Sequence, residues 1–245
     1  MQARRAPRRA SDAATSGVKT GTRGASSALL AGASGLIGRA LLGLLLATPR
    51  YRRVHVLSRR AVPDLPAHAK LEVSLVDFAA LPVLPPVDDV FIALGTTIKV
   101  AGSEAAFRRV DFDAVVAVAR AARAAGANCL LVVSALGADP RSRVFYSRVK
   151  GEMEQAVAQL GYPRVVFAQP SLLVGDRARL GQPRRAGEEW ALRLLRPALG
   201  LVPRAVRPID ADLVARALLR AASEAGPGVT RISSGQMQLP VGPQR

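Results

Sequence analysis

Three glycines at fixed spacing constrain the fold of this chain more than any other feature of its sequence. Gly32, Gly35 and Gly38 follow a short apolar run at residues 28–31 and lead into a strongly apolar stretch at residues 36–47. A strand, a glycine turn and a helix in this order let the backbone approach a dinucleotide pyrophosphate, which the helix N-terminus attracts. We therefore expect a dinucleotide to contact the residues of this turn: Gly32, Ser34, Gly35, Leu36, Ile37 and Gly38.

Short apolar runs alternate with helical patterns along the rest of the chain. The sequence predicts strands at residues 28–31, 54–57, 71–76, 90–94, 129–134, 164–169 and 229–232, and helices at residues 36–47, 112–125, 144–160, 188–195 and 210–222. Short, almost continuously apolar strands between helices indicate a parallel sheet that is covered on both faces. The predicted fold is α/β, a single doubly wound, parallel-sheet Rossmann-type domain at residues 28–245. A small C-terminal segment, mainly residues 170–225, would form its substrate side.

The formal net charge of the chain is +17, but the pattern of this charge does not indicate a nucleic-acid interface. Most of the excess comes from scattered arginines, and aromatic residues, which stack on bases in single-strand binders, make up only 4% of the chain. We expect no specific nucleic-acid partner; a basic protein that uses only the fold to associate with nucleic acid is a third hypothesis. No apolar run approaches the roughly 18 residues that span a bilayer, so no membrane span is predicted.

Residues 1–27 have a composition of their own. They hold six basic residues against one acid and show almost no apolar periodicity, which predicts a disordered basic tail. The same composition describes a mitochondrial transit peptide, and a start codon placed too far upstream is a further alternative. The single cysteine, Cys129, excludes an intramolecular disulfide and suits a reducing compartment. We predict a cytoplasmic protein.

The end of the second predicted strand indicates which dinucleotide is preferred. Domains that prefer NAD place an acid about 20 residues after the glycines, whereas an arginine there accommodates the 2′-phosphate of NADP. Here Arg59 and Arg60 follow the strand, and no carboxylate comes before Asp64. NADP(H) is therefore the predicted cofactor, and later strand ends add four candidate contacts: Asp77, Leu94, Gly95 and Thr96. The first of these could equally cap a helix, and the last two could form a plain turn.

A tyrosine and a lysine one helical turn apart are the candidate proton-transfer residues. Free tyrosine has a pKa near 10, and a lysine on the same helix face favours the phenolate through its positive charge. Tyr146 and Lys150 have this spacing, and Ser134 ends the strand that precedes their helix. Because open α/β sheets build their sites at strand ends, we expect Ser134 to hydrogen-bond the oxygen of a carbonyl substrate. The histidines, His55 and His68, lack carboxylates at ligand spacing, so no metal site is predicted.

These motifs together resemble the short-chain dehydrogenase/reductase superfamily, and within it the atypical branch typified by the Tat-interacting-protein oxidoreductases. The resemblance rests on Phe91–Thr97, Ala101–Ser103, Val110-Asp111, Val133–Asp139, Tyr146–Glu154 and Pro170–Arg177. It implies a Rossmann-type domain with NADPH, catalytic positions at Ser134, Tyr146 and Lys150, and Pro170 at the border of the nicotinamide. One departure concerns Asp111, because many extended reductases carry asparagine near this position.

Two functional hypotheses follow from the resemblance and the intact catalytic residues. The first is an NADPH-dependent oxidoreductase that reduces a small carbonyl compound by hydride transfer, with Tyr146 as the proton donor. The alternative is an NADPH-binding regulatory or scaffold protein without significant turnover, since the fold alone does not decide function. Both a monomer and a homodimer are compatible with the sequence.

Overall fold

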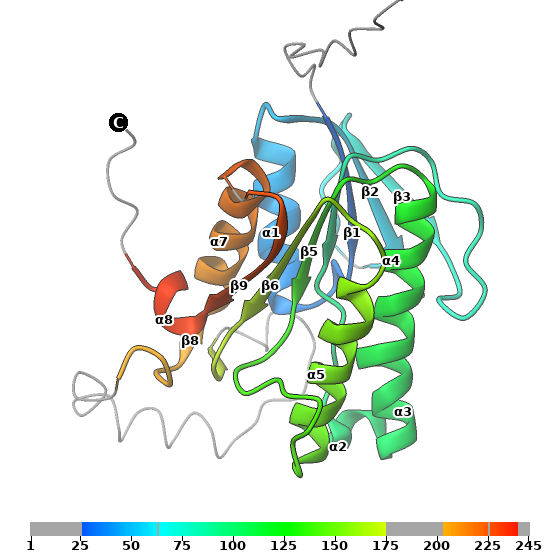
Figure 1. Cartoon of the computed structure of the whole chain (residues 1–245). Helices are drawn as coiled ribbons and strands as arrows, with labels where there is room; N and C mark the ends of the chain where they lie inside the picture. Colours follow the sequence, from blue (N-terminus) through cyan, green and yellow to red (C-terminus); the bar gives the residue numbers. More distant parts are fainter. Residues whose placement is uncertain (1–25, 63, 175–202, 225, 240–245) are drawn as a thin grey trace, which may run out of the picture.

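The structure, a computed structural model, describes residues 26–62, 64–174, 203–224 and 226–239. Its main strands are β1 (Ser26–Ala31), β2 (Tyr51–Ser58), β3 (Leu71–Leu75), β4 (Asp89–Ile92), β5 (Cys129–Val133), β6 (Arg164–Gln169) and β9 (Gly228–Ser233). They form one sheet of seven parallel strands in the order β3-β2-β1-β4-β5-β6-β9 (Figure 1). The strand order reverses between β1 and β4, so the predicted doubly wound, Rossmann-type α/β fold is confirmed.

Helices cover both faces of this sheet (Figure 1). The helical elements are α1 (Leu36–Ala47), α2 (Ile98–Ala101), α3 (Glu104–Arg108), the π-helical turn η1 (Arg109–Asp113), α4 (Ala114–Ala124), α5 (Phe145–Ala158), α7 (Ala211–Glu224) and α8 (Ser234–Met237). α1 and α7 pack on one face, and α4 and α5 pack on the other. No helix within the described ranges is long and apolar enough to cross a membrane.

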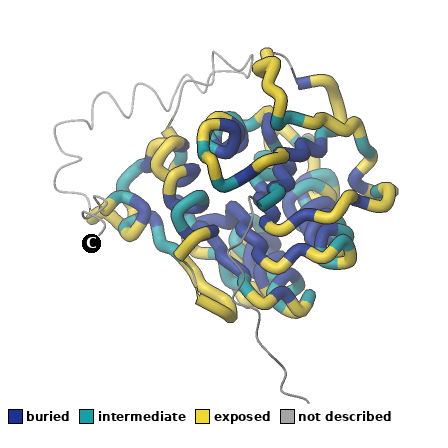
Figure 2. The backbone as a smooth tube through the Cα atoms, turned by 90° about the horizontal axis from the view of Figure 1, so that it is seen from above, coloured by how far each residue is buried: buried dark blue, intermediate teal, exposed yellow. Residues whose placement is uncertain are grey.

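Alternating side chains of the central strands fill the two layers of the core. Leu30 and Phe91 pack toward α1 and α7, while their neighbours Leu29 and Ile92 pack toward α4 and α5. These side chains are almost completely inaccessible to solvent, and Figure 2 shows the buried centre inside an exposed rim. Strands that are buried on both faces must be apolar at successive positions, which explains the continuous apolar runs of the sequence.

The helical segment before β5 begins earlier than the sequence predicts. A helix was expected at residues 112–125, but α3, η1 and α4 follow one another from Glu104 to Ala124. The Ser103 hydroxyl caps α3 by accepting the Ala106 N–H at 3.1 Å, a start signal that the prediction missed. The π-helical turn between the two α-helical pieces has no signature in the apolar pattern, and such turns are frequent at functional sites.

Other element boundaries differ from the predictions by a few residues. β1 begins at Ser26 and β2 at Tyr51, earlier than the predicted starts at residues 28 and 54. A small second sheet, β7 (Leu173–Val174) with β8 (Ile209–Asp210), was not predicted because two-residue strands carry no periodicity. The helix predicted at residues 188–195 lies outside the described residues. So does the predicted tail at residues 1–27, except that Ser26 and Ser27 belong to β1.

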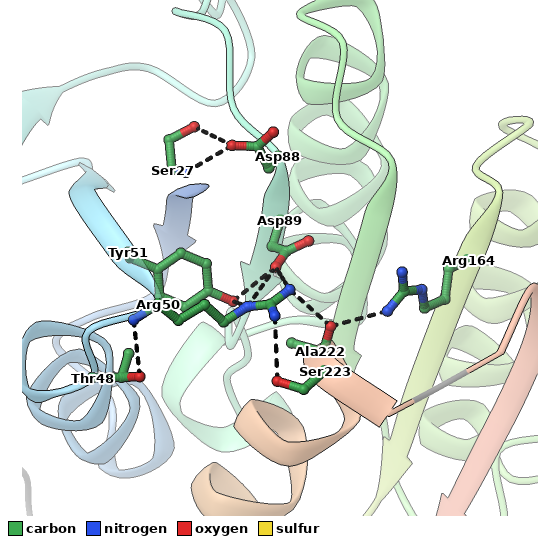
Figure 3. A network of polar contacts seen from close by, with 9 residues as sticks. All are labelled: Ser27, Thr48, Arg50, Tyr51, Asp88, Asp89, Arg164, Ala222 and Ser223. Atoms are coloured by element: carbon green, nitrogen blue, oxygen red, sulfur yellow. Dashed lines mark hydrogen bonds and ion pairs between the residues drawn. The ribbon is translucent and has the colours of Figure 1, made fainter. Parts of the chain in front are cut away.

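Polar groups at the amino-terminal edge of the sheet pair with one another (Figure 3). The Asp89 carboxylate at the start of β4 accepts hydrogen bonds from Arg50 Nη2 at 2.7 Å and from the Tyr51 hydroxyl at 2.8 Å. The Ala222 carbonyl oxygen accepts from Arg50 Nη2 at 3.0 Å and from Arg164 Nη1 at 2.9 Å. This carbonyl lies in the last turn of α7, where helical carbonyls lack intrahelical partners and favour positive charge. Burial and the Asp89 carboxylate both raise the pKa of Tyr51, so its hydroxyl stays a donor.

Candidate active site

The glycine turn after β1 lies at the point where the strand order reverses. Gly32 has a φ of +99°, and a Cβ atom there would lie 2.5 Å from the backbone of Ala93, which follows β4. A Cβ atom at Gly38 would lie 1.9 Å from the Gly32 carbonyl oxygen. The turn therefore requires both glycines for its own packing, because they let α1 and the neighbouring strand end approach it closely.

Gly35 differs from these two glycines because the protein has room for a side chain there. Its added Cβ atom would lie 3.6 Å from the Gly32 carbonyl oxygen, which is ordinary contact, and its φ is negative. Gly35 is also the N-cap residue of α1, and no side chain caps this helix. Uncapped N–H groups and a positive helix end can hold an anionic pyrophosphate that approaches the backbone at Gly35. The turn thus fits a dinucleotide pyrophosphate, whichever of the two nicotinamide cofactors carries it.

Exposed side chains lie at the carboxyl ends of β2 and β3, beside β1. Arg59 and Arg60 follow β2 and are exposed to solvent, as a ligand for a 2′-phosphate must be. The Ser58 hydroxyl donates to the Arg60 carbonyl at 2.7 Å and fixes the turn that carries the two arginines. Asp77 follows β3, and its carboxylate accepts the Ala79 N–H at 2.9 Å within its own turn. A turn follows Asp77 in place of the helix that the capping alternative supposed, so its carboxylate is engaged within this turn.

Ser134 and Pro170 lie side by side at the carboxyl ends of β5 and β6. The Ser134 N–H donates to the Ala168 carbonyl at 2.8 Å, and the Leu136 N–H donates to the Pro170 carbonyl at 2.9 Å. The Ser134 hydroxyl is buried and has no hydrogen-bond partner among the residues that the structure describes. Because buried polar groups are normally hydrogen-bonded, an unpartnered hydroxyl at a strand end indicates a place for a ligand atom.

Tyr146 and Lys150 lie one turn apart near the start of α5. Tyr146 is half-buried, and its ring lies 5.5 Å from the ring of Phe107 on α3 in a tilted arrangement. α5 sits tightly against the preceding loop, because a Cβ atom at Gly151 would lie 2.2 Å from the backbone of Asp139 and Pro140. These contacts fix the helix that presents the tyrosine and the lysine to the carboxyl edge of the sheet.

Lys150 is buried and forms an ion pair with Asp111 of η1. The Lys150 Nζ atom lies 2.7 Å from Asp111 Oδ1, and both side chains are almost inaccessible to solvent. Burial lowers the pKa of Lys150, but the Asp111 carboxylate and other nearby acidic groups outweigh burial, so its pKa is raised. The second carboxylate oxygen of Asp111 accepts the Thr96 N–H at 2.8 Å. The sequence marked Asp111 only as a departure from other reductases and did not predict this pair.

The predicted site residues therefore lie in two groups along the carboxyl edge of the sheet, one around Asp111 and one at the ends of β2 and β3. Contacts through Asp111 join Thr96 and Lys150, and a Cβ atom at Gly95 would lie 3.4 Å from Asp111 Oδ1. Arg59, Arg60 and Asp77 lie at strand ends on the other side of the glycine turn, and Leu94 is half-buried after β4. A dinucleotide that extends along the edge would reach both groups, as ligands do in open α/β sheets.

A family model and a solved structure agree on the family to which this chain is similar. Residues 32–162 match the family model described as NAD(P)H-binding. A crystal structure of an oxidoreductase of the short-chain dehydrogenase/reductase family from Burkholderia thailandensis has a TM-score of 0.63 at 19% identity, covering 87% of this chain and 93% of the other. At this identity the likeness concerns the fold alone. Together with the family model, it bears out the resemblance to short-chain dehydrogenases/reductases.

Curated relatives extend over most of the chain and correct the predicted location. The protein named "Protein fmp52, mitochondrial" from Emericella nidulans is 33% identical over 207 residues, covering 80% of this chain and 87% of the relative. The protein of the same name from Aspergillus fumigatus is 36% identical over 208 residues, covering 80% of this chain and 86% of the relative. Both names contradict the cytoplasmic location. That prediction relied on cysteine usage, which reports a reducing compartment and does not distinguish between organelles.

Proposed function

Because the chain belongs to the NAD(P)H-binding family, we propose that it is an oxidoreductase that uses NADPH to reduce the carbonyl group of a small compound. The observation that carries this proposal is the placement of a buried, charged Lys150 one helical turn from Tyr146, at the edge that holds the glycine turn. The unpartnered hydroxyl of Ser134 at the same edge supports it. By analogy with the names of its relatives, we propose a mitochondrial location.

Each part of the cofactor has a proposed partner in this chain. The uncapped N-terminus of α1 would hold the pyrophosphate, with Gly35 as the point of closest approach. Arg59 and Arg60 would bind the 2′-phosphate, and Lys150 and Thr96, which Asp111 joins, would lie beside the nicotinamide ribose. The bound cofactor would supply the hydride, and the remaining chemistry falls to side chains of the protein.

The proton that completes the reduction would come from Tyr146. The Ser134 hydroxyl donates a hydrogen bond to the carbonyl oxygen and holds it against the Tyr146 hydroxyl. As negative charge develops on this oxygen, the Tyr146 O–H bond breaks and its proton passes to the oxygen, which yields an alcohol. The phenolate that remains is stabilised by the Lys150 ammonium until solvent returns a proton to the tyrosine.

Cofactor titration by calorimetry tests the binding part of this proposal. NADPH should bind at least about tenfold more tightly than NADH, since one charge-assisted contact is worth roughly 1.4 kcal/mol or more. The double substitution Arg59→Ala/Arg60→Ala should abolish this preference. Arg52→Ala/Arg53→Ala is the matched control, because these exposed arginines lie at the other end of β2. Equal affinities for the two cofactors in the wild type would contradict the assignment.

An aldehyde and ketone panel with NADPH tests the catalytic part. We expect NADPH oxidation with at least one small carbonyl compound, whereas tight NADPH binding without turnover on any compound would indicate the regulatory alternative. No observation in the structure favours that alternative over the enzyme.

A further inference from the structure

Next to the Asp111–Lys150 pair, the other buried charge in the described part of the chain is Glu154, and it is already engaged. On α5, the Glu154 carboxylate lies one turn beyond Lys150 and is buried. It accepts hydrogen bonds from Arg231 of β9 at 2.8 Å and from Gln169 of β6 at 2.9 Å. The Glu154 carboxylate therefore has a cation of its own.

In the described part of the chain, the remaining elements around the pair contribute no further buried charge, and Arg108 of α3, which is partly exposed, is paired with Glu152 of α5. The loop after β4 contributes the Thr96 N–H, and β5 leads to the neutral hydroxyl of Ser134. η1 also carries Arg109 and Asp113, but both are exposed to solvent. The acidic groups that raise the pKa of Lys150 are Asp111, Tyr146 and Glu154, so Tyr146 is the one that could replace Asp111 as counter-ion.

We propose that Asp111 is a positioning residue that serves as the permanent counter-ion of Lys150 and thereby keeps Tyr146 protonated and able to donate. A buried ammonium needs an anion beside it, because an unpaired charge in the interior is strongly unfavourable. Asp111 meets this need without Tyr146, since its Oδ1 atom lies 2.7 Å from Nζ and the Thr96 N–H holds its other oxygen. This inference rests on the proposed role of Tyr146 as proton donor.

Removal of the Asp111 charge should transfer the role of counter-ion to the Tyr146 phenolate. In Asp111→Asn the amide oxygen can still accept the Thr96 N–H, so the fold of the loop is kept while the charge is lost. Lys150 then attracts the phenolate alone, and Tyr146 should ionise at a lower pH than in the wild type by about one pH unit or more.

Tyrosinate absorbance in the cofactor-free protein measures this directly. The chain has three tyrosines, and burial raises the pKa of both Tyr51 and Tyr162, so the ionisation of these two moves to higher pH. Tyr146→Phe should remove the first step and so identify it. Asp111→Asn should move that step to lower pH, and the matched control Asp113→Asn, an exposed change in the same turn, should not. An unmoved step in Asp111→Asn would overturn the proposal, and circular dichroism over the same pH range shows that the protein stays folded.

A second variant and a second readout keep the test decisive. Asp111→Ser is also neutral and offers a hydroxyl to Thr96, so it replaces Asp111→Asn if the latter does not fold. With an active substrate, the alkaline fall in the rate of carbonyl reduction should move to lower pH by a similar amount. A rate lowered equally at every pH would show a merely structural role for Asp111. Because the absorbance titration needs no turnover, the two failures are distinguishable: a protein that reduces no carbonyl compound refutes the proposed function, and an unmoved tyrosinate step in an active protein refutes the role of Asp111 alone.

Discussion

The two edges of the central sheet differ in whether their polar groups have hydrogen-bond partners. At the amino-terminal edge, the Asp89 carboxylate accepts three hydrogen bonds from neighbouring side chains and the Ala222 carbonyl accepts two (Figure 3). At the carboxyl edge, within the described ranges, the Ser134 hydroxyl is buried without a partner and no side chain caps α1. Satisfied polar groups stabilise a fold, whereas unsatisfied ones cost stability and persist where a ligand completes them.

We infer that the amino-terminal edge stabilises the fold and that the carboxyl edge carries the function. The amino edge joins β2, β4 and β6 to the end of α7 through charged groups that satisfy one another. The carboxyl edge carries the glycine turn, the lysine–aspartate pair and the exposed arginines. Substitutions at the amino edge should therefore change the free energy of unfolding, and substitutions at the carboxyl edge should change binding or turnover.

The largest expected effect is the loss of turnover when the hydroxyl of Tyr146 is removed. Tyr146→Phe keeps the ring beside Phe107, so NADPH should still bind within a few-fold and the melting temperature should not change. Carbonyl reduction should fall about a hundredfold or more, as is usual when a general acid is deleted. Steady-state rates and calorimetry on the purified variant measure the two effects.

Tyr51→Phe is the matched control at the amino edge, because it also removes one tyrosine hydroxyl, in this case from the contact with Asp89. It takes one donor from the Asp89 carboxylate and should cost roughly 1–2 kcal/mol of unfolding free energy, with turnover unchanged. A Tyr51→Phe variant that loses turnover while Tyr146→Phe keeps it would reverse the assignment of the two edges.

Asp89→Asn should produce the largest loss of stability among these variants. It removes the negative charge between Arg50 and Tyr51, and the partly exposed Arg50 then keeps only part of its pairing. We expect a loss of about 2–3 kcal/mol in urea unfolding, somewhat below the cost of breaking a fully buried pair. NADPH affinity measured below the unfolding transition should stay the same. A variant of wild-type stability would show that this network contributes little to the fold.

Gly35→Ala should have only a small effect on the protein itself while weakening cofactor binding. The added methyl group makes ordinary contacts within the protein but lies where we place the pyrophosphate. We expect about a tenfold loss of NADPH affinity, from blocked approach of the backbone, and a loss of at most about 1 kcal/mol in unfolding free energy, because alanine is a poorer N-cap residue than glycine.

Gly43→Ala controls for the change in helix propensity. Gly43 lies inside α1 with nothing within 4 Å of an added Cβ atom, so this substitution should raise stability by roughly 0.5–1 kcal/mol and leave affinity alone. Equal NADPH affinities of the Gly35→Ala and Gly43→Ala variants would contradict the proposed position of the pyrophosphate at this turn.

Local patterns in the sequence predicted most of the fold. The apolar run at residues 164–169 coincides with β6, and the glycine turn lies between β1 and α1 as its spacing requires. Such features depend on neighbouring residues, so the sequence displays them. The candidate catalytic residues were also found locally, since Tyr146 and Lys150 share one helix face.

The charged pairs at both edges could not be predicted in this way. Asp111 meets Lys150 across 39 positions of the chain, and Asp89 meets Arg50 across the same separation. Their contacts depend on the π-helical turn and on strand register, and neither of these can be predicted from a short stretch of sequence. The location was missed for another reason, because composition does not name an organelle.

A single-turnover reaction with NADPH deuterated at its transferable position tests the central claim most directly. The wild-type protein is mixed with an active carbonyl compound from the panel, and the product is examined by mass spectrometry. We expect an alcohol that carries deuterium on the former carbonyl carbon, formed at least about a hundredfold more slowly by Tyr146→Phe. Deuterated alcohol formed equally fast by both proteins, or no deuterated alcohol from any carbonyl compound while NADPH stays bound, would contradict it.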